Sequence, residues 1–166
     1  MSIFPAKILL ATDGSYEAEL ARVTAVDMAT STDSELHVVH VGVVPAFLEN
    51  YSGTLGYDRK IYEEMEEESR ELLRKLTWQV KVAGGSVAGT YFRVGTVELE
   101  IVNLAEELGA DLIVVGCRGH RGIRTLIEGS ISAAVIRHAP CPVLVVRSHK
   151  SDEGPRPRDL IHVGRR

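Results

Sequence analysis

The feature that most constrains the fold of this 166-residue chain is a set of five short apolar runs, each separated from the next by a segment with helical periodicity. The runs are rich in valine, isoleucine and leucine, and three of them are nearly continuous. Such runs are typical of strands buried on both faces of a parallel sheet. We predict strands over residues 7–12, 35–42, 87–94, 111–116 and 142–147.

The first intervening segment begins at Ser15, a residue type that caps helix N-termini, and we predict a helix from there to about residue 30. Helical spacing predicts an inner face made of Leu20, Val23, Ala25, Met28 and Ala29.

Three further helices follow from the same reasoning. The longest covers 58–83 and stops at two glycines. The next is capped by Thr96 and ends at Gly109, and the last runs from Ser130 to about residue 138. Trp78, in the longest helix, is predicted to pack rather than to serve as a stacking platform. His37 and His40 lie in a predicted strand, and we interpret both as structural.

Strands that alternate with helices predict an α/β fold with a single domain, built as an open parallel five-stranded sheet with helices on both faces. We place this domain in residues 1–148 and expect 149–166, which is polar and charged, to form a flexible C-terminal tail. Residues 44–57 are predicted to form a long irregular loop.

Composition excludes several classes of protein. The formal net charge of −4 lacks the basic field of a general nucleic-acid binder, so no nucleic acid is expected as a partner. No apolar run approaches the roughly 18 to 20 residues that span a bilayer, so no membrane association is expected. Two cysteines make neither a disulfide framework nor a four-ligand metal site. With no apparent export signal, a cytoplasmic location is the expectation.

The segment from Gly116 to Ser132, GCRGHRGIRTLIEGSIS, carries the candidate chemistry. Gly116, Gly119 and Gly129 follow the spacing G-x2-G-x9-G, with Ser130 next. Glycines let backbone N–H groups approach an anion, a helix N-terminus favours negative charge, and nearby arginines add positive charge. The segment could therefore bind phosphate, although it matches neither a Walker A loop nor G-x-G-x-x-G. The alternative is a plain strand-to-helix connection with incidental glycines.

A second candidate is the sequence ATDGS that ends the first predicted strand. Asp13 could accept hydrogen bonds from ribose hydroxyls or hold a divalent cation beside phosphates. The alternative is that Asp13, Gly14 and Ser15 only form the turn and cap the first helix.

These motifs resemble the ATP-binding branch of the universal stress protein family. The resemblance covers about residues 3–148 and rests on KILLATDGS, ELHVVHV and DLIVVGCRGHRG…EGSIS…CPVLVV. It implies the Rossmann-like fold of the adenine nucleotide alpha hydrolase-like group, with strand order 3-2-1-4-5. That order would place Asp13 and Gly116 at one crevice.

The resemblance also implies function. It implies a regulatory protein of the stress response that binds ATP, ADP or AMP, with Mg or Mn considered as a metal beside Asp13. It further implies a homodimer paired through the last strand, which starts at Pro142 and ends at Arg147. The residues implied to contact the nucleotide are Ala11, Thr12, Asp13, Val41, Val115, Gly116, Arg118, Gly119, Gly129, Ser130, Ile131 and Ser132.

Two other functions stay open at this point. One is a slow ATPase or phosphotransferase, although no G-x-S-x-G elbow or convincing pair of nucleophile and base is present in the sequence. The other is a dimeric interaction module that has lost nucleotide binding. The intact glycine spacing favours a nucleotide-binding protein over this last alternative.

Overall fold

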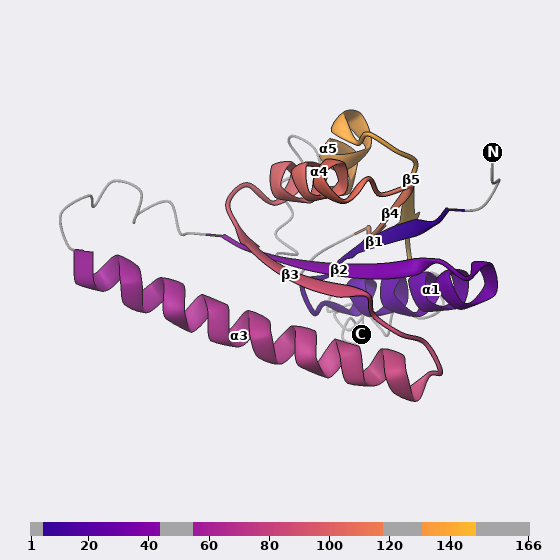
Figure 1. Ribbon diagram of the computed structural model, residues 1–166. Coiled ribbons are helices and arrows are strands. Elements are labelled where there is room, and N and C mark those ends of the chain that lie inside the picture. Colours follow the sequence, from indigo (N-terminus) through magenta and orange to yellow (C-terminus); the bar gives the residue numbers. More distant parts are fainter. Residues whose placement is uncertain (1–4, 44–54, 118–130, 149–166) are drawn as a thin grey trace, which may run out of the picture.

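The computed structural model describes residues 5–43, 55–117 and 131–148, with the side chains of 55–58 excepted. The described part is an α/β domain in which five parallel strands form one sheet (Figure 1). The strands are β1 (Lys7–Ala11), β2 (Glu35–Gly42), β3 (Gly89–Val94), β4 (Leu112–Gly116) and β5 (Val143–Val146). Their order in the sheet is β3-β2-β1-β4-β5, so the predicted fold class and strand order are confirmed.

Four helices are described: α1 (Tyr16–Thr32), α3 (Leu55–Val82), α4 (Val97–Leu108) and α5 (Ile131–His138). α1 and α3 cover one face of the sheet, and α4 and α5 cover the other (Figure 1). All the predicted strands and helices are present, with boundaries that differ by up to three residues. Residues 55–57, predicted as part of a loop, belong to the first turn of α3. Among the described residues, no helix combines the length and apolar composition needed to cross a bilayer.

The core consists of two apolar layers because the central strands alternate their side chains between two covered faces. Ile8, Leu10 and Val38 face α1 and α3, whereas Leu9 and Ile113 face α4 and α5. This burial on both faces explains the nearly continuous apolar runs in the sequence.

The inner face of α1 is lined by alanines. Its buried apolar residues are Ala18, Ala21, Ala25, Val26 and Ala29. Small side chains let the helix axis lie close to the sheet, so backbone can meet backbone there. The prediction that Val23 belongs to this face is wrong, because its side chain is 45% exposed.

The exposed side chains on the outer face of α3 correct a second prediction. Trp78 was predicted to pack, but it is 65% exposed and Val82 is 67% exposed. The residues of α3 that enter the core are Leu73, Leu76 and Val80. Trp78 lies two residues from Leu76 and Val80, so a rotation of about 100° per residue turns it to the opposite side of the helix.

Candidate functional site at the carboxyl edge of the sheet

The chain reverses its direction of winding between β1 and β4, at the centre of the sheet. These strands pair with each other through the register Ile8↔Leu112, Leu9↔Ile113 and Leu10↔Val114. Their carboxyl ends, Ala11 and Gly116, therefore lie at the same edge. The helix after β1 covers one face and α5, the next described helix after β4, covers the other (Figure 1). In open parallel sheets, this arrangement opens a crevice where ligands bind.

The turn after β1 presents Asp13 at this edge. Its Oδ1 accepts a hydrogen bond from the Ser15 N–H at 3.0 Å, and Thr12 Oγ1 accepts one from the Gly14 N–H at 3.3 Å. Gly14 has a φ of 75°, a conformation that costs glycine little. The Ser15 hydroxyl accepts a hydrogen bond from the Ala18 N–H at 3.2 Å, so the predicted cap of α1 is confirmed.

This geometry supports the local interpretation of Asp13 as a turn residue, since one carboxylate oxygen already holds the turn together. That role leaves the predicted contact with a nucleotide untested. A cluster of three or more side chains suited to binding a metal does not occur in the described part of the chain.

Gly116, at the end of β4, has a structural role that the sequence did not reveal. A Cβ built on Gly116 would lie 2.8 Å from the carbonyl carbon of Glu17 and 3.0 Å from the Ala18 nitrogen. The end of β4 therefore packs directly against the backbone of the first turn of α1. Glycine is required here for close contact between strand and helix, independently of any contact with phosphate.

Glu17 is a residue at this edge that sequence reasoning missed altogether. Although it is charged, it is only 8% exposed. Its Oε2 accepts a hydrogen bond from the Ser148 N–H at 3.1 Å, and its Oε1 accepts one from the Ser148 hydroxyl at 2.8 Å. Glu17 thus joins the first turn of α1 to the residue that lies just beyond β5. Its position in an acidic first helical turn gave no signal of this contact.

The other predicted site residues are placed differently. Val41 and Val115 contribute side chains to the layer beneath α4 and α5, so only their backbone groups are candidates for contact with a ligand. Ile131 and Ser132 begin α5, where Ile131 is exposed and Ser132 is buried. Of the remaining predicted residues, Ala11 ends β1. Arg118, Gly119, Gly129 and Ser130 lie outside the described residues.

His40, on β2, contributes a buried titratable group near the same edge. Its ring stacks on Phe92 with centroids 6.2 Å apart, and its buried Nδ1 has no hydrogen-bond partner among the described residues. Burial lowers the pKa of His40, and the negative charges of Asp13 and Glu68 oppose that shift in part. The structural role of His40 stays a prediction, and the ring also lies within electrostatic range of Asp13.

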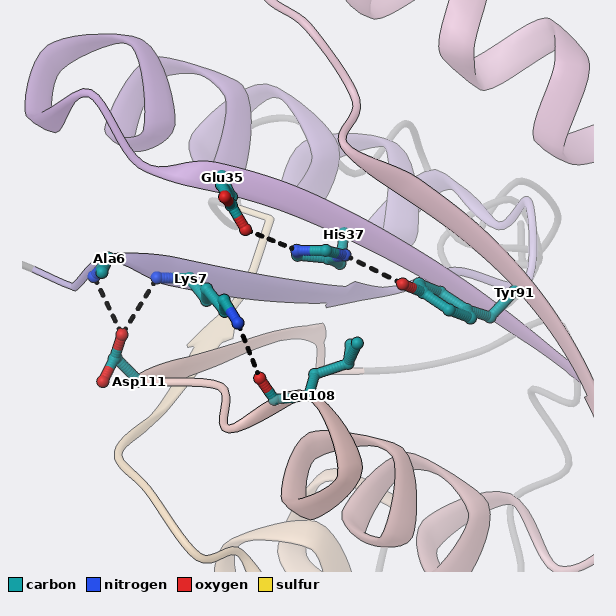
Figure 2. A network of polar contacts seen from close by, with 7 residues as sticks. All are labelled: Ala6, Lys7, Glu35, His37, Tyr91, Leu108 and Asp111. Atoms are coloured by element: carbon teal, nitrogen blue, oxygen red, sulfur yellow. Dashed lines mark hydrogen bonds and ion pairs between the residues drawn. The ribbon is translucent and has the colours of Figure 1, made fainter.

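Polar contacts at the opposite, amino edge of the sheet fasten the starts of the strands (Figure 2). Asp111 Oδ2 accepts hydrogen bonds from the backbone N–H groups of Ala6 and Lys7 at 2.9 and 3.0 Å. His37 Nδ1 lies 3.1 Å from the Tyr91 hydroxyl, and its Nε2 lies 3.2 Å from Glu35. These contacts satisfy polar groups at strand starts, which supports the structural interpretation of His37.

The fold and this site define an α/β protein with an open parallel sheet and a candidate ligand crevice at its carboxyl edge. The chain belongs to the universal stress protein family, because the model of that family matches residues 6–147. A Staphylococcus haemolyticus protein named for the same family is 39% identical over 147 residues, which are 88% of this chain and 87% of the relative.

Solved structures agree with this assignment. The hypothetical protein MJ0577 is similar with a TM-score of 0.73 and 27% identity, over 87% of this chain and 97% of that one. A universal stress protein in complex with cAMP is similar with a TM-score of 0.67 and 25% identity, over 86% of this chain and 97% of the other.

Proposed function

We propose that this protein binds an adenine nucleotide, with ATP as the principal ligand, and acts as a nucleotide-dependent regulatory protein of the stress response. One observation carries the proposal. β1 and β4 are neighbours at the centre of the sheet, where the chain reverses its direction of winding, and their carboxyl ends bring Asp13 and Gly116 to one edge. The sequence motif ATDGS and the first glycine of G-x2-G-x9-G-S thereby lie at the edge where open parallel sheets bind ligands.

A related complex supports the class of ligand. The universal stress protein solved with cAMP shares 25% identity and the fold with this chain. In the proposed complex, Asp13 lies at the nucleoside and the segment that starts at Gly116 lies at the phosphates. The N-terminus of α5 adds N–H groups near Ser132. A cytoplasmic location stays part of this proposal.

The free energy of nucleotide binding requires the whole segment from Gly116 to Ser132, because a helix N-terminus alone contributes too little. A helix dipole contributes about 0.3–1 kcal/mol to binding an anion. Micromolar affinity corresponds to about 8 kcal/mol. Charge-assisted hydrogen bonds from several N–H groups, together with burial of the base, must provide the difference. Mg²⁺ or Mn²⁺ bound by the phosphates and Asp13 would neutralise part of the anionic charge.

The protein is further proposed to form a homodimer through β5. This strand lies at the end of the strand order, so one of its edges pairs with no strand among the described residues. Unpaired N–H and C=O groups of such an edge favour pairing with another strand.

Isothermal titration calorimetry with ATP, ADP, AMP and cAMP tests the nucleotide proposal. The expected result is saturable binding of ATP in the micromolar range, lost in the double variant Gly119→Val with Gly129→Val, because the added side chains occupy the anion site. Thermal unfolding of the variant controls for loss of fold. Failure of all four nucleotides to bind at millimolar concentration contradicts the proposal.

The same samples discriminate binding from turnover. Phosphate release is measured with ATP and Mg²⁺ for the wild type and for Asp13→Ala. A nucleotide-binding regulator should bind ATP without appreciable turnover. Steady turnover that disappears in Asp13→Ala while binding persists would establish an ATPase instead.

A further inference from the structure

Glu17 makes a buried contact that an isolated helix cap does not require. Both of its carboxylate oxygens accept hydrogen bonds from one residue, Ser148, through its N–H and its hydroxyl. Burying a carboxylate is costly unless hydrogen bonds replace its hydration. The contact also spans 131 positions of the chain, so only the folded sheet brings the two residues together.

The backbone of Glu17 makes a different contact. The peptide group between Glu17 and Ala18 lies against Gly116, where a Cβ would come within 2.8–3.0 Å of its atoms. No side chain of Gly116 separates the strand from the helix, and the adjacent inner-face residue, Ala18, has only a methyl group. No space separates the two close-packed backbone segments. A shift of Gly116 must therefore move the first turn of α1 as well.

One residue thus contacts two strand ends through two different groups: its peptide group meets β4, and its carboxylate holds Ser148, two residues beyond the end of β5. We propose that Glu17 is a positioning residue that couples occupancy of the nucleotide site to the carboxyl end of β5. The inference rests on the proposed function. Phosphates bound by the segment that starts at Gly116 hold this strand end against α1, and the carboxylate of Glu17 then holds Ser148 more tightly.

The chemistry of the contact requires a carboxylate. Ser148 presents two donors, its backbone N–H and its hydroxyl, to two acceptor oxygens. A glutamine at position 17 has one oxygen and one NH₂ group, so it can replace only one acceptor and faces the other donor with a donor. Glu17→Gln therefore breaks half of the contact without a change of volume, and Glu17→Ala breaks all of it.

Amide hydrogen exchange followed by NMR measures the coupling directly at the Ser148 N–H. Saturating ATP should slow exchange of this amide about fivefold or more, the lower end of typical coupling between sites. The Asp111 N–H, which bonds to the Lys7 carbonyl at the amino edge of the sheet, serves as a reference amide away from the nucleotide site. A merely structural contact would give the same exchange ratio between Ser148 and Asp111 with and without ATP.

Thermodynamic linkage gives a second measurement. If ATP strengthens the contact by a given factor, breaking the contact must weaken ATP binding by the same factor. Glu17→Ala should therefore lose about fivefold or more in ATP affinity, with Glu17→Gln between it and the wild type. Glu19→Gln is the matched control, because it removes the same charge from the same helical turn but its carboxylate bonds to Arg22. Equal affinities for Glu17→Gln and Glu19→Gln would overturn the proposal.

A variant without ligand separates this inference from the proposed function. Gly116→Ala places a methyl group against the peptide of Glu17, so it should speed exchange at Ser148 relative to Asp111 in the absence of ATP. Unchanged relative exchange would overturn the coupling path even if ATP binds. Faster exchange in this variant would support mechanical coupling from Gly116 through Glu17 to Ser148. If the wild type also failed to bind ATP, the nucleotide proposal would be contradicted, and with it the inference that Glu17 responds to nucleotide occupancy.

Discussion

At the scale of single residues, the buried imidazole of His40 makes the stability of the folded protein depend on pH. Within the described part of the chain, the buried Nδ1 of His40 has no hydrogen-bond partner, while Asp13 and Glu68 supply the negative charges that act on the ring. Phe92, on the adjacent strand, contributes an aromatic face and no charge. Burial outweighs the two carboxylates, so the folded protein favours the neutral ring and the pKa is lowered below 6.5.

This shift predicts a pH dependence with a definite sign. Between the lowered pKa of the folded state and the ordinary value near 6.5, the unfolded chain binds more protons at His40 than the folded chain does. The free energy of unfolding from this residue is therefore largest above 6.5 and falls as the pH is lowered through that window. His40→Gln should flatten the pH dependence, as measured by urea unfolding between pH 5 and pH 7.5.

Circular dichroism of His40→Gln at pH 7.5 verifies that the variant retains the fold. An unchanged slope of unfolding free energy against pH would show that burial of His40 does not govern the dependence.

Residues differ sharply in how far their roles could be predicted. The cap at Ser15 was predictable because a cap acts within four residues of the chain. The buried contact of Glu17 was not, because Ser148 meets it only when β5 and α1 are both in place. Gly116 was assigned to phosphate on the glycine spacing and the family resemblance, whereas its close packing against Glu17 needs three-dimensional information.

At the scale of elements, α1 and α4 both have a hydroxyl residue at the N-cap position, but only one of the two hydroxyls makes a capping hydrogen bond. Ser15 caps α1 through a hydrogen bond from the Ala18 N–H to its hydroxyl, whereas Thr96 takes the cap position of α4 without a side-chain hydrogen bond. The prediction of Thr96 as a cap is thus confirmed in position, but the bond that stabilises such caps is missing.

This difference predicts that removal of the two side-chain hydroxyls lowers the free energy of unfolding by unequal amounts. Ser15→Ala should lower the free energy of unfolding by about 1 kcal/mol, because it leaves a buried N–H without its acceptor. Thr96→Ala, the matched control, should cost less than about 0.5 kcal/mol, as is usual for an exposed position without such a feature. Chemical denaturation of both variants in one buffer gives the comparison. Equal losses would show that the hydroxyl of Ser15 adds nothing beyond helix propensity.

The outward residues of α1 and α3 show where sequence patterns fail at this scale. Helical spacing alone does not choose between two apolar stripes in α1, so Val23 was assigned inward, and Trp78 in α3 was expected to pack. The choice is made by close packing against the sheet, which selected the alanine stripe of α1 and the stripe of Leu73, Leu76 and Val80 in α3.

At the scale of the whole molecule, the alternation of elements predicted an open parallel sheet, but the order of its strands came only from the family resemblance. Hydrophobic patterns record which residues are buried and not which strands are neighbours. The edge position of β5, on which the proposed dimer depends, is therefore a property of topology. The carbonyls of Pro142 and Val146 accept hydrogen bonds from the N–H groups of Ile113, in β4, and Cys117, just after it. The backbone groups of Val143 and Val145 therefore point to the open edge.

This orientation gives a sharp test of the dimer. Val145→Pro removes an N–H that faces outward, and should leave the bonds from β5 to β4 in place. The expected result is a monomer in native mass spectrometry, where the wild type gives a dimer. Val145→Ala is the control, because it also loses packing in the core but keeps the N–H group. A dimer that persists in Val145→Pro would show that the copies meet elsewhere.

The two ends of the described chain leave the sheet at opposite edges, with a practical consequence for any assay of this protein. β1 starts at the edge where Asp111 binds the backbone of Ala6 and Lys7, and β5 leads to Ser148 beside Glu17. An affinity tag or fluorophore joined before β1 is therefore attached on the side away from the nucleotide crevice. The same label attached after β5 would be joined to the chain at the contact it is meant to observe.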